Sequence, residues 1–275
     1  MKENDLFIFD QNSAWGAALS EHLAGLVPAA AVDIIRSKQP QFMEDAAKIL
    51  LSAGGPNNRQ QIIRAITSWI ESRTIAVYHG SRLDGSDLED IRRDGLLALV
   101  PEERNKYLEK KLSGHPRWES VKANLEPLLL KLSEKYEIGD RMGQVHGTLS
   151  RAGLLKGFNH YLTHGSEFDQ HVAYRLLEDD GMELLAKYGN PVLITLAVPG
   201  DKALDAANPF REIGGEIPNV VREVIQVWSY WLVHRDFSAA TQRIDCGFMF
   251  YQDIPAGWIH SVEEIELPST KETPG

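Results

Sequence analysis

The most chemically suggestive stretch of the sequence is TIAVYHGSR, from Thr74 to Arg82, in which a histidine follows a short β-type run and precedes a glycine. A ring nitrogen of His79 can form a hydrogen bond with a hydroxyl group. Gly80 has no side chain, so a ligand can approach the backbone there, and its amide can bind a carboxamide or phosphate oxygen. These residues predict a ligand site where a strand ends. The alternative is a histidine whose hydrogen bonds are satisfied at the strand terminus without a ligand.

Two other kinds of site are not favoured by the residue pattern. His160, His164 and His171 lie close together in the sequence, but there is no HExxH motif and the single cysteine, Cys246, is remote, so we expect no metal site. Ser81 is not part of a G-x-S-x-G motif, which argues against a serine hydrolase.

The elements that would position His79 are a strand over residues 74–79 and a helix that follows it. The helix is expected to begin at Ser86 or Asp87, either of which can act as a cap, and to stop at Gly95. Between residues 14 and 73, apolar residues recur at three- and four-residue spacings, with breaks at prolines and glycines, which predicts a helical N-terminal region over residues 1–73.

The rest of the chain is expected to mix helices and strands. Residues 101–150 are charged and helical in pattern, and we interpret them as an insertion. A short strand is expected near residues 158–165, followed by a helix capped by Ser166. Late runs rich in β-branched residues predict strands within 191–200, 222–234 and 246–264, and residues 269–275 are expected to form a flexible tail. Helices followed by mixed strands indicate an α+β protein.

Composition restricts the expected setting and partners. The chain has 275 residues and a formal net charge of -10, which weighs against general attraction to nucleic acid or anionic membranes. A single cysteine excludes an intramolecular disulfide and suits a reducing compartment, so we expect a cytoplasmic location. No apolar run has the length of a signal peptide or of a membrane span, and no membrane partner is expected.

One segment resembles a known family. The run YHGSRLDGSDLEDIRRDGLL is similar to the first motif of poly(ADP-ribose) polymerase catalytic domains and their bacterial ADP-ribosyltransferase relatives, which reads strand, His-Gly-Ser or His-Gly-Thr, helix and Gly-Leu. The run NHYLTHGSEFDQHVAYRLL resembles the second motif, with Tyr161 as the tyrosine of the catalytic triad and Tyr174 as a second ring beside nicotinamide. His171 stands where many relatives carry a small serine.

The third motif of the family is a glutamate at the start of a late strand. NVVREVIQVW resembles it, with Glu223 in the motif position, and Glu216 in a Gly-Pro loop is the competitor. The closing run FMFYQDIPAGWIHSVEE is also similar to the ending of many bacterial members. The resemblance covers residues 74–264 but not the N-terminal helices.

The resemblance implies a fold, a reaction and a set of site residues. The expected fold has an ADP-ribosyltransferase-like split sheet, mixed or antiparallel, within residues 74–268. The expected activity is transfer of ADP-ribose from NAD, the co-substrate, to a protein or nucleic acid. Such an activity is typical of a bacterial toxin or phage-defence effector, and a neutralising antitoxin is then an expected partner. The implied triad is His79, Tyr161 and Glu223, and the implied cofactor contacts are Gly80, Ser81, Arg82, Tyr174 and His171.

The chemistry of NAD suits such a set. The nicotinamide group is a cationic leaving group, so its bond to ribose needs no general acid, unlike an ordinary glycoside. One carboxylate can stabilise the oxocarbenium-like centre that forms. Aromatic rings can hold the planar, cationic nicotinamide by stacking and cation–π attraction. Two alternatives stay open: an NAD glycohydrolase, with water as acceptor, and a non-catalytic module that binds NAD or ADP-ribose.

Overall fold

The computed structural model describes residues 6–134, 138, 141–157, 159–207 and 217–267. The competing Glu216 and the expected tail lie outside the described residues. The chain is α+β, as predicted, and it divides into two compact units. Unit 1 comprises residues 1–77, 148–157 and 197–249, and unit 2 comprises residues 78–147, 158–196 and 250–275. In the described ranges, no helix combines the length and the apolar character needed to cross a membrane.

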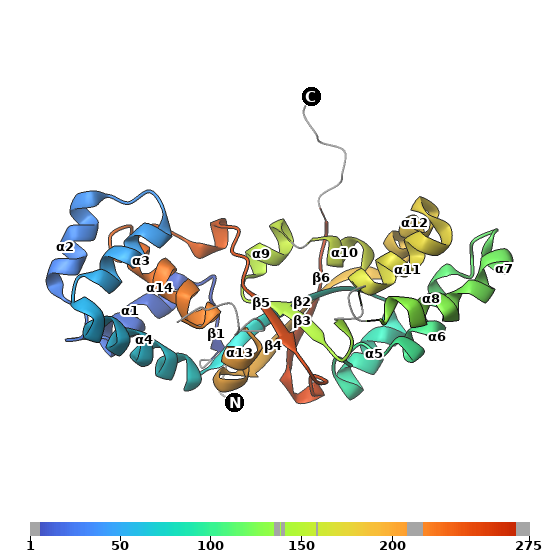
Figure 1. Cartoon of the computed structure of the whole chain (residues 1–275), viewed down its shortest axis with the longest axis horizontal. Helices are drawn as coiled ribbons and strands as arrows, with labels where there is room; N and C mark the ends of the chain where they lie inside the picture. Colours follow the sequence, from blue (N-terminus) through green and yellow to red (C-terminus); the bar gives the residue numbers. More distant parts are fainter. Residues whose placement is uncertain (1–5, 135–137, 139–140, 158, 208–216, 268–275) are drawn as a thin grey trace, which may run out of the picture. The chain divides into compact units, whose positions relative to one another are not determined.

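The elements are labelled in Figure 1. The strands are β1 (Leu6–Phe7), β2 (Thr74–Leu83), β3 (Val145–Thr148), β4 (Asn190–Pro199), β5 (Gly247–Phe250) and β6 (Ile259–Glu264). The helices are α1 (Asn12–His22), α2 (Ala29–Lys38), α3 (Met43–Ser52), α4 (Gly55–Glu71), α5 (Gly85–Asp94), α6 (Pro101–Leu112), α7 (Trp118–Val121), α8 (Leu125–Leu132), α9 (Arg151–Lys156), α10 (His160–His164), α11 (Glu167–Leu177), α12 (Asp179–Lys187), α13 (Gly200–Ala206) and α14 (Asn219–Trp231). Short 3-10 turns are η2 (Lys122–Asn124), η5 (Ala239–Thr241) and η6 (Ala256–Trp258).

The strands follow the order β5-β3-β2-β4-β6, and β1 pairs with β2 beside that path. β1 runs parallel to β2, with Leu6 opposite Thr74. β4 runs antiparallel to β6, with Ile194 opposite Val262. The sheet therefore contains both parallel and antiparallel pairs.

Strand β2 does not end at His79, so the strand end predicted at this residue is wrong. The strand continues to Leu83, and His79 and Ser81 share one face because side chains alternate along a strand. The helix that follows is α5, and its cap is Asp84 rather than Ser86 or Asp87. Asp84 and Asp87 form a reciprocal capping box, in which each side chain accepts the other residue's backbone N–H at 3.0 Å. The expected stop at Gly95 is confirmed, with a φ of +90°.

Unit 1 contains the predicted N-terminal helices, which are confirmed as α1 to α4. They do not stand apart from the later chain, because α14 packs against α1, α3 and α4, and α13 packs against α4 (Figure 1). The indole N–H of Trp228, a buried residue of α14, lies 3.2 Å from the carbonyl oxygen of Gly16 and 3.1 Å from the hydroxyl oxygen of Ser20, both in α1. The core of unit 1 thus joins segments from both ends of the sequence.

The strand predicted within residues 222–234 is wrong, because this segment forms helix α14. Val220, Val224, Trp228 and Trp231 recur at helical spacing and are all buried. Their β-branched and aromatic side chains are also typical of strands, so residue type favoured the wrong element here.

Unit 2 contains residues 101–147 of the segment interpreted as an insertion, and they are not a polar appendage. Helices α6, α8, α11 and α12 pack on one another (Figure 1). Their core consists of buried apolar side chains from both sides of the expected insertion boundary: Leu108, Leu112, Trp118, Leu125, Leu129, Leu132, Phe168, Val172, Ala173, Leu177 and Leu185. The predicted insertion also ends too late, since its residues 145–148 form β3, a neighbour of β2 in the sheet.

The strand expected near residues 158–165 is also wrong. Residues 160–164 form the short helix α10. The Ser166 cap of the next helix is confirmed, because its hydroxyl oxygen accepts the backbone N–H of Asp169 at 3.3 Å. The chain therefore reaches α11 through a tight helix-to-helix connection at Gly165, whose φ is +80°.

Candidate functional site

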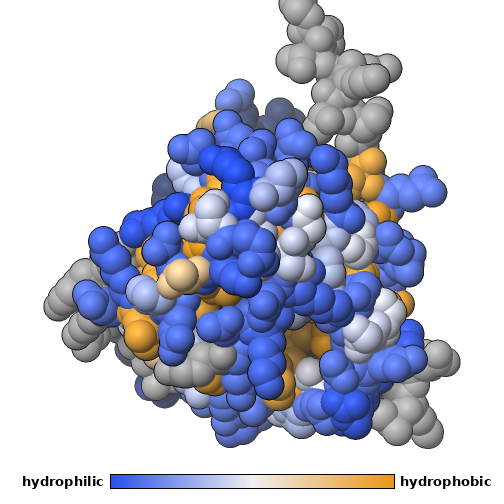
Figure 2. Space-filling view, turned by 90° about the vertical axis from the view of Figure 1, so that its right-hand side faces the viewer, coloured by the Kyte–Doolittle hydropathy of each residue, from blue (hydrophilic) through white to orange (hydrophobic). Residues whose placement is uncertain are grey.

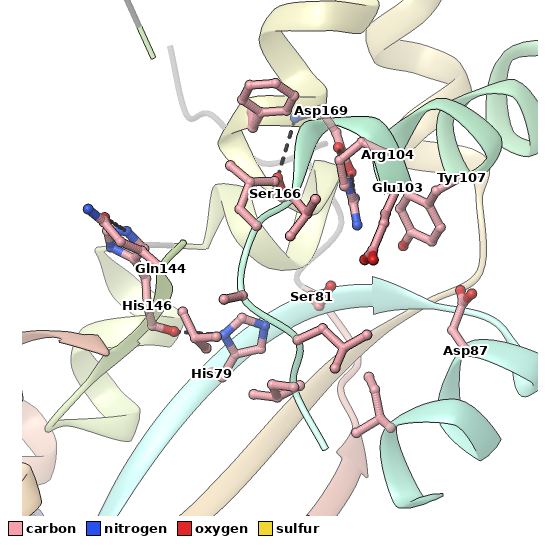
Figure 3. A pocket seen from close by; sticks show the side chains of 18 of the residues that line it. His79, Ser81, Asp87, Glu103, Arg104, Tyr107, Gln144, His146, Ser166 and Asp169 are labelled. Carbon is pink, nitrogen blue, oxygen red and sulfur yellow. Dashed lines mark hydrogen bonds and ion pairs between the residues drawn. The ribbon is translucent and has the colours of Figure 1, made fainter. Parts of the chain in front are cut away.

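A pocket with a volume of about 450 Å³ lies within unit 2, where it meets the face of β2 that carries His79 and Ser81 (Figure 3). Its volume is in the range of small-molecule sites, about 300–1,000 Å³. Residues of α5, α6, β3, α10 and α11 also line it, together with residues of the segments between α5 and α6 and before β3. Figure 2 shows the surface of the side formed by the unit 2 helices, which is mostly hydrophilic with apolar residues in a hollow.

His79 contributes a neutral imidazole to this pocket. Its Nδ1 lies 2.7 Å from the backbone carbonyl oxygen of His146 in β3, and since a carbonyl only accepts, Nδ1 carries the proton. Burial lowers the pKa of His79, which keeps the ring neutral and leaves Nε2 as an acceptor. Burial also lowers the pKa of His146, to about 4, with help from the positive charge of Arg141. The pocket therefore offers His79 Nε2 as an acceptor for a ligand hydroxyl at neutral pH.

Tyr161 lies in α10 and lines the same pocket, as part of a polar cluster. Its hydroxyl donates to Oε2 of Glu167 at 3.3 Å, and Arg141 forms an ion pair with the same oxygen at 2.8 Å. Burial raises the pKa of Tyr161, so the phenol stays protonated and remains a donor. We call Tyr161, Glu167 and Arg141 the tyrosine cluster.

An apolar wall is formed by the segment from Gly95 to Val100. Leu96 and Ile254 hold this segment by two backbone hydrogen bonds, 3.0 Å and 2.8 Å long. Leu97 is 57 % exposed and lines the pocket, so the wall presents apolar surface to whatever enters. Such a wall suits the face of a planar ring.

Charged residues of α6 and α11 complete another part of the lining. Asp169 is fully buried and accepts Nε of Arg104 at 3.0 Å, with a further contact between Oδ2 and the guanidinium. Nζ of Lys111 lies 3.8 Å from Oδ2 of Asp169 and 3.9 Å from the centre of the Tyr107 ring. This buried charge cluster of Asp169, Arg104 and Lys111 ties α6 to α11 at the pocket.

The buried charge cluster predicts a dependence of stability on alkaline pH. Desolvation lowers the pKa of Lys111 to about 8, below its value of about 10.4 in an unfolded chain. Between these values the unfolded chain keeps the proton and the folded chain loses it, so the free energy of unfolding rises as pH increases from about 8 to 10. Urea unfolding at a series of pH values measures this, and we expect Lys111→Met to reduce the slope. If the free energy of unfolding has the same slope against pH in Lys111→Met and in the unsubstituted protein, the pH dependence comes from other groups.

Several residues implied by the resemblance do not line the pocket. Arg82 points to the opposite side of β2 from His79 and donates to the carbonyl oxygens of Tyr188 at 2.8 Å and Gly189 at 2.7 Å. It therefore holds the chain before β4 and is not placed as a cofactor contact. Tyr174 and His171 lie on exposed positions of α11 outside the lining. Gly80 and Ser81 do line the pocket.

The expected third member of the triad, Glu223, does not line the pocket either. It lies on α14 in unit 1 rather than at the start of a strand, and it forms an ion pair with Arg222 at 3.2 Å. Burial raises its pKa. The structure thus places His79 and Tyr161 at one pocket and leaves Glu223 elsewhere.

Sequence reasoning missed Glu167 and Arg141. Glu167 is the first residue of α11 and follows the predicted cap Ser166, so the sequence does predict its position in the first turn of a helix. Arg141 lies between α8 and β3 in the segment interpreted as an insertion, and no local pattern connects it to Tyr161.

Comparisons of the chain with protein-family models, with curated proteins and with solved structures gave no match.

Proposed function

We propose that the pocket of unit 2 binds NAD and that the protein transfers ADP-ribose from NAD to a macromolecular acceptor, protein or nucleic acid. The observation that supports this best is that His79 and Tyr161, which the family resemblance pairs across a long stretch of sequence, line one pocket together with Gly80 and Ser81. The finer assignment of an ADP-ribosyltransferase-like sheet is part of the same proposal.

The contacts of the pocket suit the parts of NAD. Nε2 of His79 accepts a hydrogen bond from a ribose hydroxyl, because its ring is neutral and its proton is on Nδ1. The nicotinamide ring lies between the Tyr161 ring and the apolar wall, where stacking and cation–π attraction favour a planar cation. Acidic side chains in the lining, among them Asp87 and Glu103, add a negative field that favours the pyridinium charge.

Calorimetry with NAD and a nicotinamide-release assay test the proposal. The unsubstituted protein binds NAD and releases nicotinamide, and labelled NAD marks an acceptor in cell extract. His79→Ala lowers NAD affinity about 10-fold, because a hydrogen bond in the site is lost. His171→Ala is the matched control, since this histidine is exposed outside the pocket. Equal affinities of the two variants, or no binding by the unsubstituted protein, would contradict the proposal.

A second candidate is a module that binds NAD or ADP-ribose without turnover. The position of Glu223 favours it, because the carboxylate that the resemblance implies is not part of the lining. Binding of NAD without nicotinamide release selects this function. Release with free ADP-ribose as the main product selects a glycohydrolase instead.

A further inference from the structure

We propose that Glu167 is the carboxylate that stabilises the positive charge developing on ribose as nicotinamide leaves, and that Arg141 is its positioning residue. This assignment rests on the proposed function. It replaces Glu223 with a glutamate that the pocket itself contains.

The other carboxylates of the lining are less suited to this role. Asp169 is committed to the buried charge cluster. Asp87 belongs to the capping box of α5, and Asp90 and Asp94 both pair with Arg93. The Glu103 side chain (labelled in Figure 3) forms no ion pair or hydrogen bond with another described residue, and the residue is exposed, so no contact holds its carboxylate in place.

Glu167 is held by contacts that leave one oxygen available. The Tyr161 hydroxyl and the Arg141 guanidinium both bind Oε2, at 3.3 Å and 2.8 Å. Oε1 has no hydrogen bond to another of the residues that the structure describes, so it can accept one from a ribose hydroxyl. The side chain is 30 % exposed, which fits a group at the wall of an open pocket. A carboxylate fixed in advance needs little reorganisation as charge develops near it.

The hydrogen bond from Tyr161 indicates where the Glu167 carboxylate lies relative to the substrate. If the Tyr161 ring contacts nicotinamide, the Glu167 carboxylate, which accepts a hydrogen bond from the Tyr161 hydroxyl, lies near the bond between nicotinamide and ribose that breaks. Glu167 is also the first residue of α11, where the helix dipole favours a negative charge.

The step balances without a further reagent. The bond between ribose C1′ and the nicotinamide nitrogen breaks, and its electron pair stays on that nitrogen and neutralises the pyridinium. The ribose ring oxygen shares the positive charge left on C1′. Glu167 stabilises this charge through its hydrogen bond with a ribose hydroxyl and through direct electrostatic attraction. The acceptor atom then bonds to C1′ and releases its proton to Glu167 or to water.

Glu167→Gln tests the assignment, because it keeps the size of the side chain and removes its charge. We expect nicotinamide release to fall about 100-fold or more, while the dissociation constant for NAD from calorimetry changes less than about 3-fold. Glu223→Gln is the matched control and keeps the activity, since Glu223 lies outside the pocket. Retained NAD binding also shows that the variant is folded.

The outcomes separate the two proposals. If the unsubstituted protein releases no nicotinamide, the proposed function and this assignment both fall. If it does and Glu167→Gln retains its rate, only the assignment is wrong, and a loss in Glu223→Gln would return the role to that residue.

A second pair of variants tests Arg141 without changing Glu167. Arg141→Ala frees the carboxylate, and we expect kcat to fall about 10-fold with KM little changed, because the interaction serves the transition state. Arg141→Lys keeps a cation beside Oε2 and restores most of kcat. Equal kcat in Arg141→Ala and the unsubstituted protein would remove the positioning role.

Discussion

Asp169→Asn is expected to lower the free energy of unfolding by about 3–5 kcal/mol, the largest effect we predict for a single side chain. Asparagine keeps the volume of aspartate but removes the charge that compensates the buried Lys111 and the partly buried Arg104. Arg104 donates to Asp169 at 3.0 Å, and Lys111, whose side chain is 1 % exposed, lies 3.8 Å from it. The variant removes the carboxylate that both cations share, at a position that is itself fully buried.

Urea unfolding of the full chain measures this effect. Glu183→Gln is the matched control, because it breaks the Lys187–Glu183 pair, whose side chains are 72 % and 68 % exposed. Exposed pairs contribute about 0–1 kcal/mol, so the control should unfold near the midpoint of the unsubstituted protein. Adding Arg104→Met to Asp169→Asn should recover part of the loss, since one uncompensated cation is then removed. A loss for Asp169→Asn as small as that of the control would contradict the role of the buried charge cluster.

Gly95→Ala is expected to lower the free energy of unfolding by about 3 kcal/mol, from strain and from lost backbone pairing. Gly95 has a φ of +90°, a conformation that alanine adopts only at a cost. A Cβ there would overlap the carbonyl oxygen of Ile254 and lie 2.8 Å from the backbone nitrogen of Ala256. Ile254 is the backbone partner of Leu96, so the substitution displaces the apolar wall of the pocket.

Gly85→Ala is the control for this prediction, at the other end of the same helix. A Cβ at Gly85 meets nothing within 4 Å, so this variant should be neutral or slightly more stable. Thermal unfolding followed by circular dichroism compares the two. The explanation is wrong if both variants melt at the temperature of the unsubstituted protein.

Helices with a clear apolar period were predictable because the signal is local. Helices α1 to α5 were predicted from spacing, α11 was predicted from its Ser166 cap, and the end of α5 at Gly95 was predicted from residue type, whereas the predicted cap of α5 was wrong. Helix α14 was missed for a reason that lies in its composition. Its valines and tryptophans favour strands by residue type. Their spacing produces a helix because the apolar face of that helix packs against α1, α3 and α4.

The site was predictable in part. The resemblance of short motifs to a known family predicted His79 and Tyr161 as site residues, and both line the pocket. The same resemblance placed Arg82 with them, but strand alternation turns Arg82 toward the carbonyl oxygens of Tyr188 and Gly189. A strand that was expected to end at His79 could not show on which side Arg82 lies. Because β2 continues to Leu83, the alternation of side chains along the strand places Arg82 opposite His79.

The sequence alone determined the α+β class and the N-terminal helices, and its short motifs predicted four residues of the pocket, His79, Gly80, Ser81 and Tyr161, because each depends on residue type and spacing over a short segment. Only the tertiary structure decided that residues 101–132 help to form the core of unit 2, that Glu223 lies outside the pocket, and that Glu167 and Arg141 meet Tyr161 within it. These contacts join residues from separate elements. Their geometry is set by packing among helices and by the order of strands in the sheet, and no pattern of neighbouring residues contains it.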